Sequence, residues 1–171
     1  MIGHNYRLGE IEAAIGIEQF KKLKRLVNSR ISIARKLNEG LANLKEIKLP
    51  KINKNLENSF YVYPIIINYK KIKKSRNFIF EALKAEGVPA LMKHYINLHL
   101  LPIYQKKIGY GTKGFPWSLN KKKYNYQKGI CPIAEELNDK SFIGIELCKF
   151  QFNNQEIDEI IQAFHKVWKE I

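Results

Sequence analysis

Cysteine is scarce in this chain of 171 residues, which contains only two. Cys131 and Cys148 are too far apart to form the close-spaced pair of a typical zinc site, and two cysteines make no disulfide framework. Long apolar runs are also missing, so no segment reaches the length of a membrane-spanning helix. The N-terminus lacks the basic-then-apolar layout of a signal peptide. These absences predict a protein of a reduced, cytoplasmic compartment without a metal site or a membrane contact. The length predicts one domain, or one domain with an irregular arm.

Acidic side chains are few as well: 16 aspartates and glutamates stand against 30 lysines and arginines, which gives a formal net charge of +14. Such an excess suits a nucleic-acid or phosphate partner, because positive charge attracts polyanions. The lysines are, however, spread along the whole chain. We therefore favour a solvated lysine surface and consider nucleic acid an unlikely partner. The alternative is steering of an anionic substrate such as a nucleotide-linked sugar.

Apolar side chains recur at steps of three and four over residues 9–41, which predicts one long helix. The densest strand signal lies at 59–67, where Pro64 predicts an edge position or a bulge. Ser75 is a good cap for a helix whose inner face would comprise Phe78, Ile79 and Leu83. The order of elements predicts an α+β fold in two layers, with a small sheet backed by helices. Further elements are expected at 44–50 and 88–92 (extended), 132–137 and 155–171 (helical) and 142–147 (strand), with a long surface arm over 105–129.

The first candidate site precedes the long helix, where segment 3–7 reads Gly-His-Asn-Tyr-Arg. Asn5 can donate and accept hydrogen bonds, and Arg7 is a permanent cation with a planar fork of donors. Free N–H groups and the helix dipole favour anions at the start of a helix. Segment 3–7 thus suits a phosphate. The alternative from these residues alone is ordinary helix-entry chemistry with a surface arginine.

The second candidate site lies at 94–104, a segment that Pro102 constrains and that holds half of the four histidines. The imidazoles of His94 and His99 and the phenol of Tyr95 can hydrogen-bond sugar hydroxyls or a diphosphate. A spacing of five is not that of a helical metal pair, and no matched carboxylate accompanies it. A partly buried polar turn is an equally good interpretation of the composition.

These segments resemble the DegT/StrS-type sugar aminotransferases, which use pyridoxal phosphate (PLP). Segment 3–16 is similar to the family's Gly-x-Asn-Tyr-Arg followed by Glu-x-x-Ala-Ala-Ile-Gly, and segment 131–135 is similar to its Cys-Pro-x-Ala-Glu. The helix and strand around Arg76 and the closing helix also match, and we interpret both as structural. Asn97 replaces a proline of the family's histidine segment, and Asn58 and Tyr61 stand where many members carry two histidines.

The resemblance implies the small domain of a fold-type I aminotransferase, with a mainly antiparallel sheet. Residues 1–8 would be a linker from a large domain, 9–42 a bridging helix and 43–171 the C-terminal small domain. In a homodimer, Asn5 would reach the PLP phosphate of the neighbouring subunit, and Arg7 would contact cofactor or substrate. His94, Tyr95 and His99 would line the sugar site. The implied reaction moves an amino group from glutamate or glutamine to a keto sugar, a nucleotide-linked sugar or a cyclitol.

Amino transfer needs a lysine that forms a Schiff base with PLP, and no lysine here falls within the family's lysine motif. We therefore expect no catalytic residue in this chain and no activity from it alone. We also expect exposed apolar surface on the first turns of the long helix, and hence self-association. The competing hypothesis is a basic, non-enzymatic regulatory or interaction domain that binds nucleic acid or a partner protein.

Overall fold

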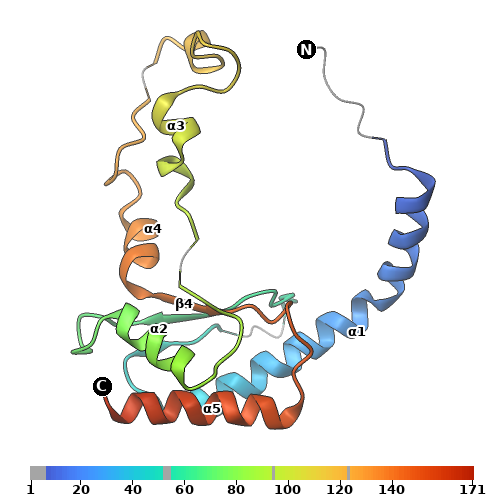
Figure 1. Ribbon diagram of the computed structural model, residues 1–171, viewed down its shortest axis with the longest axis vertical. Helices are drawn as coiled ribbons and strands as arrows, with labels where there is room; N and C mark the ends of the chain where they lie inside the picture. Colours follow the sequence, from blue (N-terminus) through green and yellow to red (C-terminus); the bar gives the residue numbers. More distant parts are fainter. Residues whose placement is uncertain (1–6, 52–54, 94, 123) are drawn as a thin grey trace.

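The computed structural model describes residues 7–51, 55–93, 95–122 and 124–171 and confirms the predicted α+β fold. A small sheet and three helices form the body, from which the first half of helix α1 and a long arm project (Figure 1). The helices of the body are α1 (Glu10–Leu41), α2 (Arg76–Ala85) and α5 (Asn154–Lys169), and the strands are β1 (Ile47–Lys48), β2 (Tyr63–Ile67), β3 (Leu91–Met92) and β4 (Phe142–Ile145).

The sheet has the strand order β1-β2-β4-β3, and every pairing in it is antiparallel. The strand expected over 59–67 begins only at Tyr63, because the backbone of Phe60 has a positive φ of 43° that no strand adopts. The prediction that Pro64 marks an edge strand is wrong for β2 as a whole, which lies between β1 and β4. Since β1 pairs only with Ile66 and Ile67, the strand is nevertheless open on that side at Pro64.

The core lies between the sheet and the three helices, and its apolar residues come from all of them. Helix α5 begins with a capping box, in which Asn153 and Glu156 each accept a hydrogen bond from the other's backbone N–H. Ser75 caps α2 by accepting from the N–H of Phe78, as predicted. Ile79 and Leu83 are buried as expected, but Phe78 is half-exposed, so its assignment to the inner face is wrong.

Helix α1 has two halves with different environments. Its C-terminal half buries Ile33, Ala34, Leu37 and Leu41 against the body and packs on α5. Its N-terminal half extends away from the body (Figure 1). Ile11 and Phe20 are each 75% exposed there, and Ile15 is 58% exposed, so the expected apolar surface is present. The division into linker, bridging helix and small domain stays a prediction.

The arm rises from the body and returns to it, and it includes most of the segment between β3 and β4 (Figure 1). The ascending leg contains a 3₁₀ turn, Leu98–Leu100, and the short helix α3 (Pro102–Lys106). Near its tip lie a bridge between Tyr110 and Phe115 and a second 3₁₀ turn, Trp117–Leu119. The descending leg ends in α4 (Pro132–Glu136) and a π-helical turn, Leu137–Ser141, which leads into β4. In the described ranges, no helix is both long and apolar enough to cross a membrane.

Candidate functional site

The base of the arm is held by Arg76, whose side chain is almost fully buried at the start of α2. Its guanidinium donates hydrogen bonds to four backbone carbonyls: those of Lys93 on the ascending leg, Asn138 and Asp139 in the π-helical turn, and Phe142 in β4. Five donors in a planar fork let one arginine satisfy several carbonyls at once. Arg76 therefore joins both legs of the arm to the body, which agrees with its structural interpretation.

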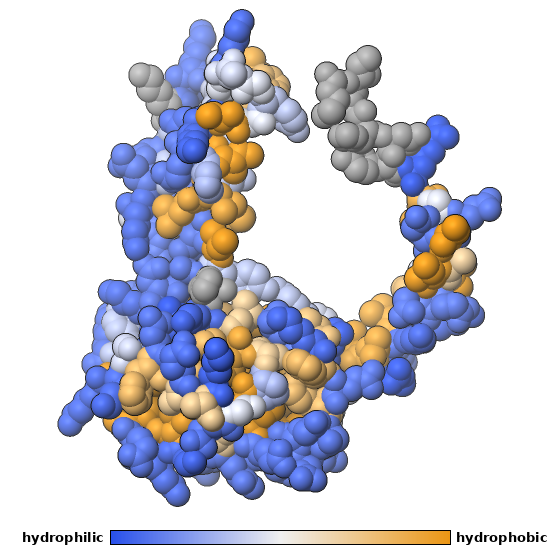
Figure 2. Space-filling view, in the orientation of Figure 1, coloured by the Kyte–Doolittle hydropathy of each residue, from blue (hydrophilic) through white to orange (hydrophobic). Residues whose placement is uncertain are grey.

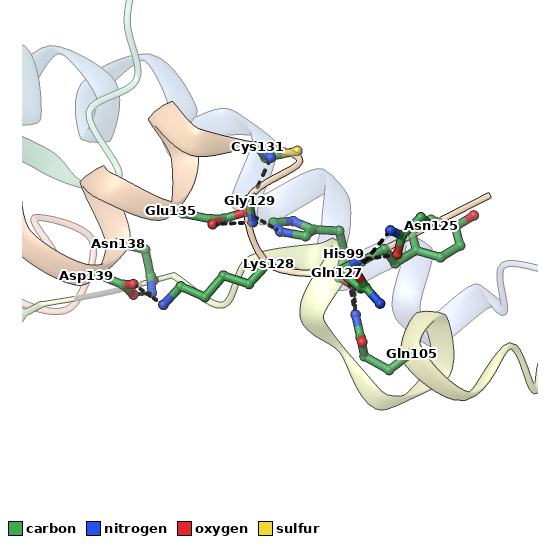
Figure 3. Close-up of polar contacts among 11 residues, drawn as sticks. His99, Gln105, Asn125, Gln127, Lys128, Gly129, Cys131, Glu135, Asn138 and Asp139 are labelled. Carbon is green, nitrogen blue, oxygen red and sulfur yellow. Dashed lines mark hydrogen bonds and ion pairs between the residues drawn. The ribbon is translucent and has the colours of Figure 1, made fainter.

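Further up, a buried pair of side chains joins the two legs (Figure 3). Nε2 of His99, in the 3₁₀ turn of the ascending leg, lies 2.9 Å from Oε1 of Glu135 in α4. The two side chains are only 10% and 8% exposed. The backbone N–H of Gly129 donates to both carboxylate oxygens at 2.8 Å, and that of Cys131 donates to Oε1 at 3.3 Å. Glu135 thus ties the turn before α4 to the histidine.

These donors hold the pKa of Glu135 below its usual value. The hydrogen bond from the backbone N–H of Gly129 is the largest cause of the lowered pKa. Burial opposes it, and Cys131 and His99 add smaller contributions that lower the pKa further. Glu135 is therefore a carboxylate at neutral pH, and it fixes the edge of the imidazole that bears Nε2. The contact fixes the orientation of the imidazole ring, and so also the direction of its other nitrogen, Nδ1.

The arm also has an aromatic brace. Gln105 donates from Nε2 to the carbonyls of His99 and Tyr126, each at 2.6 Å. The ring of Tyr104 lies edge-on to Trp117, with 6.1 Å between the ring centres, and 5.4 Å from Tyr126. The indole N–H of Trp117 donates to the hydroxyl of Tyr126 at 3.0 Å. These contacts join α3 to the descending leg and stiffen the arm above His99.

The structure does not bring the five predicted site residues together. Asn5 and His94 lie outside the described residues. Arg7 is exposed ahead of α1, and the side chain of Tyr95 is half-exposed on the ascending leg. The N-terminal half of α1 and the arm lie on opposite sides of the molecule (Figure 1). Of the three candidates that the structure describes, only His99 forms a side-chain hydrogen bond, the one to Glu135. Its binding role, and those of the other four, stay predictions.

Glu135 is the residue that sequence reasoning missed. In the sequence it is only the last residue of the Cys-Pro-x-Ala-Glu segment, and it lies 36 positions from its partner His99. That segment was the available signal, since its glutamate has no obvious role in a short exposed helix. Cys131 is exposed and donates only its backbone N–H to Glu135, which is a structural contact. No cluster of metal-binding side chains occurs among the described residues.

The described residues do not by themselves fit PLP. A Schiff-base lysine is enclosed by its cofactor site, yet none of the lysines in the described ranges is buried. Arg7, the described candidate for a cofactor contact, is exposed. No chemical step through PLP is therefore derived from these side chains.

Comparison with known sequences finds the DegT/DnrJ/EryC1/StrS aminotransferase family over residues 1–145. An uncharacterized protein of Methanocaldococcus jannaschii is 33% identical over 144 residues, which cover 84% of this chain and 36% of that protein. The spore coat polysaccharide biosynthesis protein SpsC of Bacillus subtilis is 23% identical over 98% of this chain and 38% of its own length. A UDP-4-amino-4,6-dideoxy-N-acetyl-beta-L-altrosamine transaminase of Campylobacter jejuni is 28% identical over 63% of this chain and 28% of its length.

Solved structures share the fold across nearly the whole chain. The aminotransferase TlmJ of Streptoalloteichus hindustanus superposes with a TM-score of 0.72 at 19% identity over 99% of this chain. Helicobacter pylori PseC, an aminotransferase of pseudaminic acid biosynthesis, gives 0.69 at 21% identity over 100%. This chain covers 39% and 40% of those two chains. A putative sugar aminotransferase of Streptococcus pneumoniae with the same fold has been solved in PLP and PMP forms.

These likenesses agree with the resemblance read from the motifs and with the small antiparallel sheet behind a long helix. The chain spans between 28% and 40% of the length of the relatives named above, and the fold is that of a portion of fold-type I aminotransferases. Members of the family depend on PLP. Because the family match covers residues 1–145 of 171, the chain belongs to the DegT/DnrJ/EryC1/StrS aminotransferase family.

Proposed function

We propose that this chain is the small-domain part of a PLP-dependent sugar aminotransferase. The reaction moves an amino group from glutamate or glutamine to a keto group on a nucleotide-linked sugar, another keto sugar or a cyclitol. PLP supplies the chemistry of amino transfer, and its Schiff-base lysine lies outside these 171 residues. The observation that carries the proposal is the family match over residues 1–145, combined with a described part that contains no buried lysine.

In this proposal the chain contributes binding and orientation. His99, fixed by Glu135, lines the sugar site together with His94 and Tyr95. The half-exposed side chain of Tyr95 and the brace around Gln105 support this role, because they place polar groups on a stiff scaffold. The polar edge of His99 that does not face Glu135 would contact substrate hydroxyls.

Assembly into a homodimer is part of the same proposal. Asn5 would reach the PLP phosphate of the neighbouring subunit, with Arg7 beside it. The exposed apolar half of α1 supports an assembly of this kind, since large apolar patches on a free surface mark interaction sites. A lone chain of this kind would bind no cofactor covalently and would catalyse no amino transfer.

Trapping with borohydride tests the proposal, because reduction makes a PLP–lysine Schiff base permanent. We expect no stoichiometric adduct on any one lysine when the isolated chain is mixed with PLP. We expect one adduct, on a lysine outside the 171 residues, when the protein is purified natively with whatever completes it. A single, fully occupied lysine within residues 1–171 would contradict the proposal, and so would a native preparation without any PLP.

The basic, non-enzymatic alternative makes a different prediction. A domain that binds nucleic acid through its net charge of +14 would retain a DNA oligomer at moderate salt and lose it gradually as salt rises. We expect only the weak, salt-sensitive binding of any basic protein. Tight binding at physiological salt, from a preparation that carries no PLP, would favour the alternative.

A further inference from the structure

A pocket of about 320 Å³ lies where the start of α2 meets the π-helical turn, and we refer to it as the α2 pocket. Two segments form its walls. Most of the lining residues belong to 69–77, which leads from β2 into α2, and the others are Asp139 and Lys140 of the turn. Its volume is at the lower end of the range of small-molecule sites, so the pocket suits a compact ligand.

The exposed charge around the α2 pocket is mostly positive. Three exposed lysines line it, and none of them forms an ion pair with another described residue: Lys73, Lys74 and Lys140. Nζ of Lys140 lies 5.3 Å from the ring centre of Tyr69, so this aromatic wall holds one ammonium group in place. The carboxylate in the lining is that of Asp139, and Nζ of Lys128 lies 2.6 Å from its Oδ2 (Figure 3). The lysines of the pocket are therefore available to an anion.

Arg76 adds a buried positive charge to the same walls. It lines the pocket although its side chain is only 6% exposed. The hydrogen bonds of its guanidinium go to uncharged backbone carbonyls, and its Nε has no hydrogen-bond partner among the described residues. A buried charge is ordinarily paired with an opposite charge. The unpartnered Nε and the missing carboxylate thus indicate an anion independently of the exposed lysines.

The start of α2 supplies further donors to the pocket. The backbone N–H groups of Arg76 and Asn77, the first two residues of the helix, have no acceptor among the described residues, because Ser75 caps only the N–H of Phe78. The first turn of α2 contains no acidic residue, whereas that of α5 contains Glu156. Free N–H groups and the helix dipole favour an anion at such an end.

We propose that the α2 pocket binds the phosphate group of a small phosphate monoester. Lysines bind phosphate oxygens as point charges, and the free N–H groups of α2 donate to them. Half-buried Tyr69 and Ile72 form an apolar wall for the organic part of the ester. This inference goes beyond the proposed function and does not rest on it. A nucleic-acid strand offers phosphates too, but it needs a continuous groove, whereas two short segments enclose this pocket.

NMR on the ¹⁵N-labelled whole chain tests the proposal directly. The reporters are the backbone amides of Arg76 and Asn77 and the side-chain Nε–H of Arg76. The backbone amides of Asn154 and Gln155, at the start of α5, serve as the internal reference. We expect phenyl phosphate to shift the reporters in a saturable way and to leave the reference amides unchanged. Absence of any reporter shift at millimolar phenyl phosphate would overturn the proposal.

Lysine substitutions separate the pocket from general attraction to a basic protein. Lys73→Gln and Lys140→Gln should each weaken binding of phenyl phosphate by roughly two- to fivefold, since each removes one exposed charge–charge contact. The double variant should lose roughly tenfold. The matched control combines Lys22→Gln with Lys24→Gln, which removes the same charge from the projecting half of α1 and should leave binding unchanged. An equal loss in the control would overturn the proposal.

Two further ligands decide what the pocket selects. Inorganic phosphate should shift the same amides but bind more weakly than phenyl phosphate, because it does not use the apolar wall. Binding of inorganic phosphate as tight as that of phenyl phosphate would overturn the assignment to a monoester. An oligothymidine that shifts the reporters at physiological salt, at a lower concentration than phenyl phosphate, would overturn it in favour of nucleic acid.

Discussion

At the scale of single residues, Arg76 and Glu135 hold the two legs of the arm in place through buried hydrogen bonds. Each is buried, and each joins segments that are far apart in the sequence. Arg76 donates to backbone carbonyls of both legs, and Glu135 accepts from the backbone N–H groups of the turn before α4 and contacts the side chain of His99. An arginine or glutamate is seldom buried unless its charge is hydrogen-bonded in this way. Loss of either side chain leaves polar groups without partners, so both positions should be sensitive to substitution.

Substitution of Arg76 tests its role at the base of the arm. Arg76→Met keeps an unbranched apolar stem but leaves four carbonyl groups without their hydrogen-bond donor. We therefore expect the free energy of unfolding to fall by about 3 kcal/mol. Arg35→Met on the exposed face of α1 is the control and should stay within about 0.5 kcal/mol of wild type. Urea denaturation measures both. An equal loss of unfolding free energy in the two variants would show that the hydrogen bonds of Arg76 do not stabilise the fold.

The carboxylate of Glu135 should make stability depend on pH. Because its pKa is lowered in the folded state, its stabilisation is complete above the ordinary glutamate pKa of about 4.3 and is lost as pH falls through the lowered value. Glu135→Gln should therefore be less stable than wild type at pH 7, and the difference should narrow below about pH 4.3. Thermal unfolding across pH measures this. Glu136 is an exposed neighbour on α4, and Glu136→Gln should show no such difference in stability. A stability difference between Glu135→Gln and wild type that stays constant down to pH 2 would contradict the account.

At the scale of elements, α1 is one continuous helix with a folded half and an unpartnered half. Periodicity predicted its bounds almost to the residue, because a 3.6-residue repeat is legible in one sequence. The same repeat cannot tell which apolar residues find a partner, since Phe20 and Leu37 obey one pattern while only Leu37 is buried. The N-terminal half of α1 does not pack against the body formed by the described residues.

Two substitutions on α1 should separate stability from association. Leu37→Ala creates a cavity in the core, and we expect a loss of about 3 kcal/mol in the free energy of unfolding. Phe20→Ser removes exposed apolar surface, so the stability should change by less than about 0.5 kcal/mol while self-association falls. Denaturation and sedimentation velocity measure the two quantities. A monodisperse wild-type monomer whose first helical turns resist hydrogen exchange would contradict this picture.

The strands were harder to predict than the helices. The strand signal at 59–67 was correct in kind, but its first residues bend away because Phe60 adopts a positive φ. The His99–Glu135 pair could not be predicted at all, because it joins residues 36 positions apart through the path of the arm. Local pattern determines which segments are helices, whereas the candidate site depends on which legs of a long connection meet.

At the scale of the whole molecule, the body, the arm and the exposed half of α1 surround an open space whose borders carry apolar side chains (Figure 2). Chains that match this one in sequence or fold are more than twice as long. In the proposed function these residues position and orient a ligand, and none of the lysines in the described ranges is buried. We therefore propose that this chain contributes one part of a site that another segment completes.

The most direct test of that central claim follows an isotope. Protein purified natively with whatever completes it is given glutamate or glutamine labelled with ¹⁵N at the amino or amide nitrogen and a nucleotide-linked keto sugar, and the sugar is analysed by mass spectrometry. We predict that the label appears on the sugar in the native preparation and never with the isolated chain. Transfer by the isolated chain, or no transfer by a native preparation that carries PLP across a panel of keto sugars and cyclitols, would contradict the account.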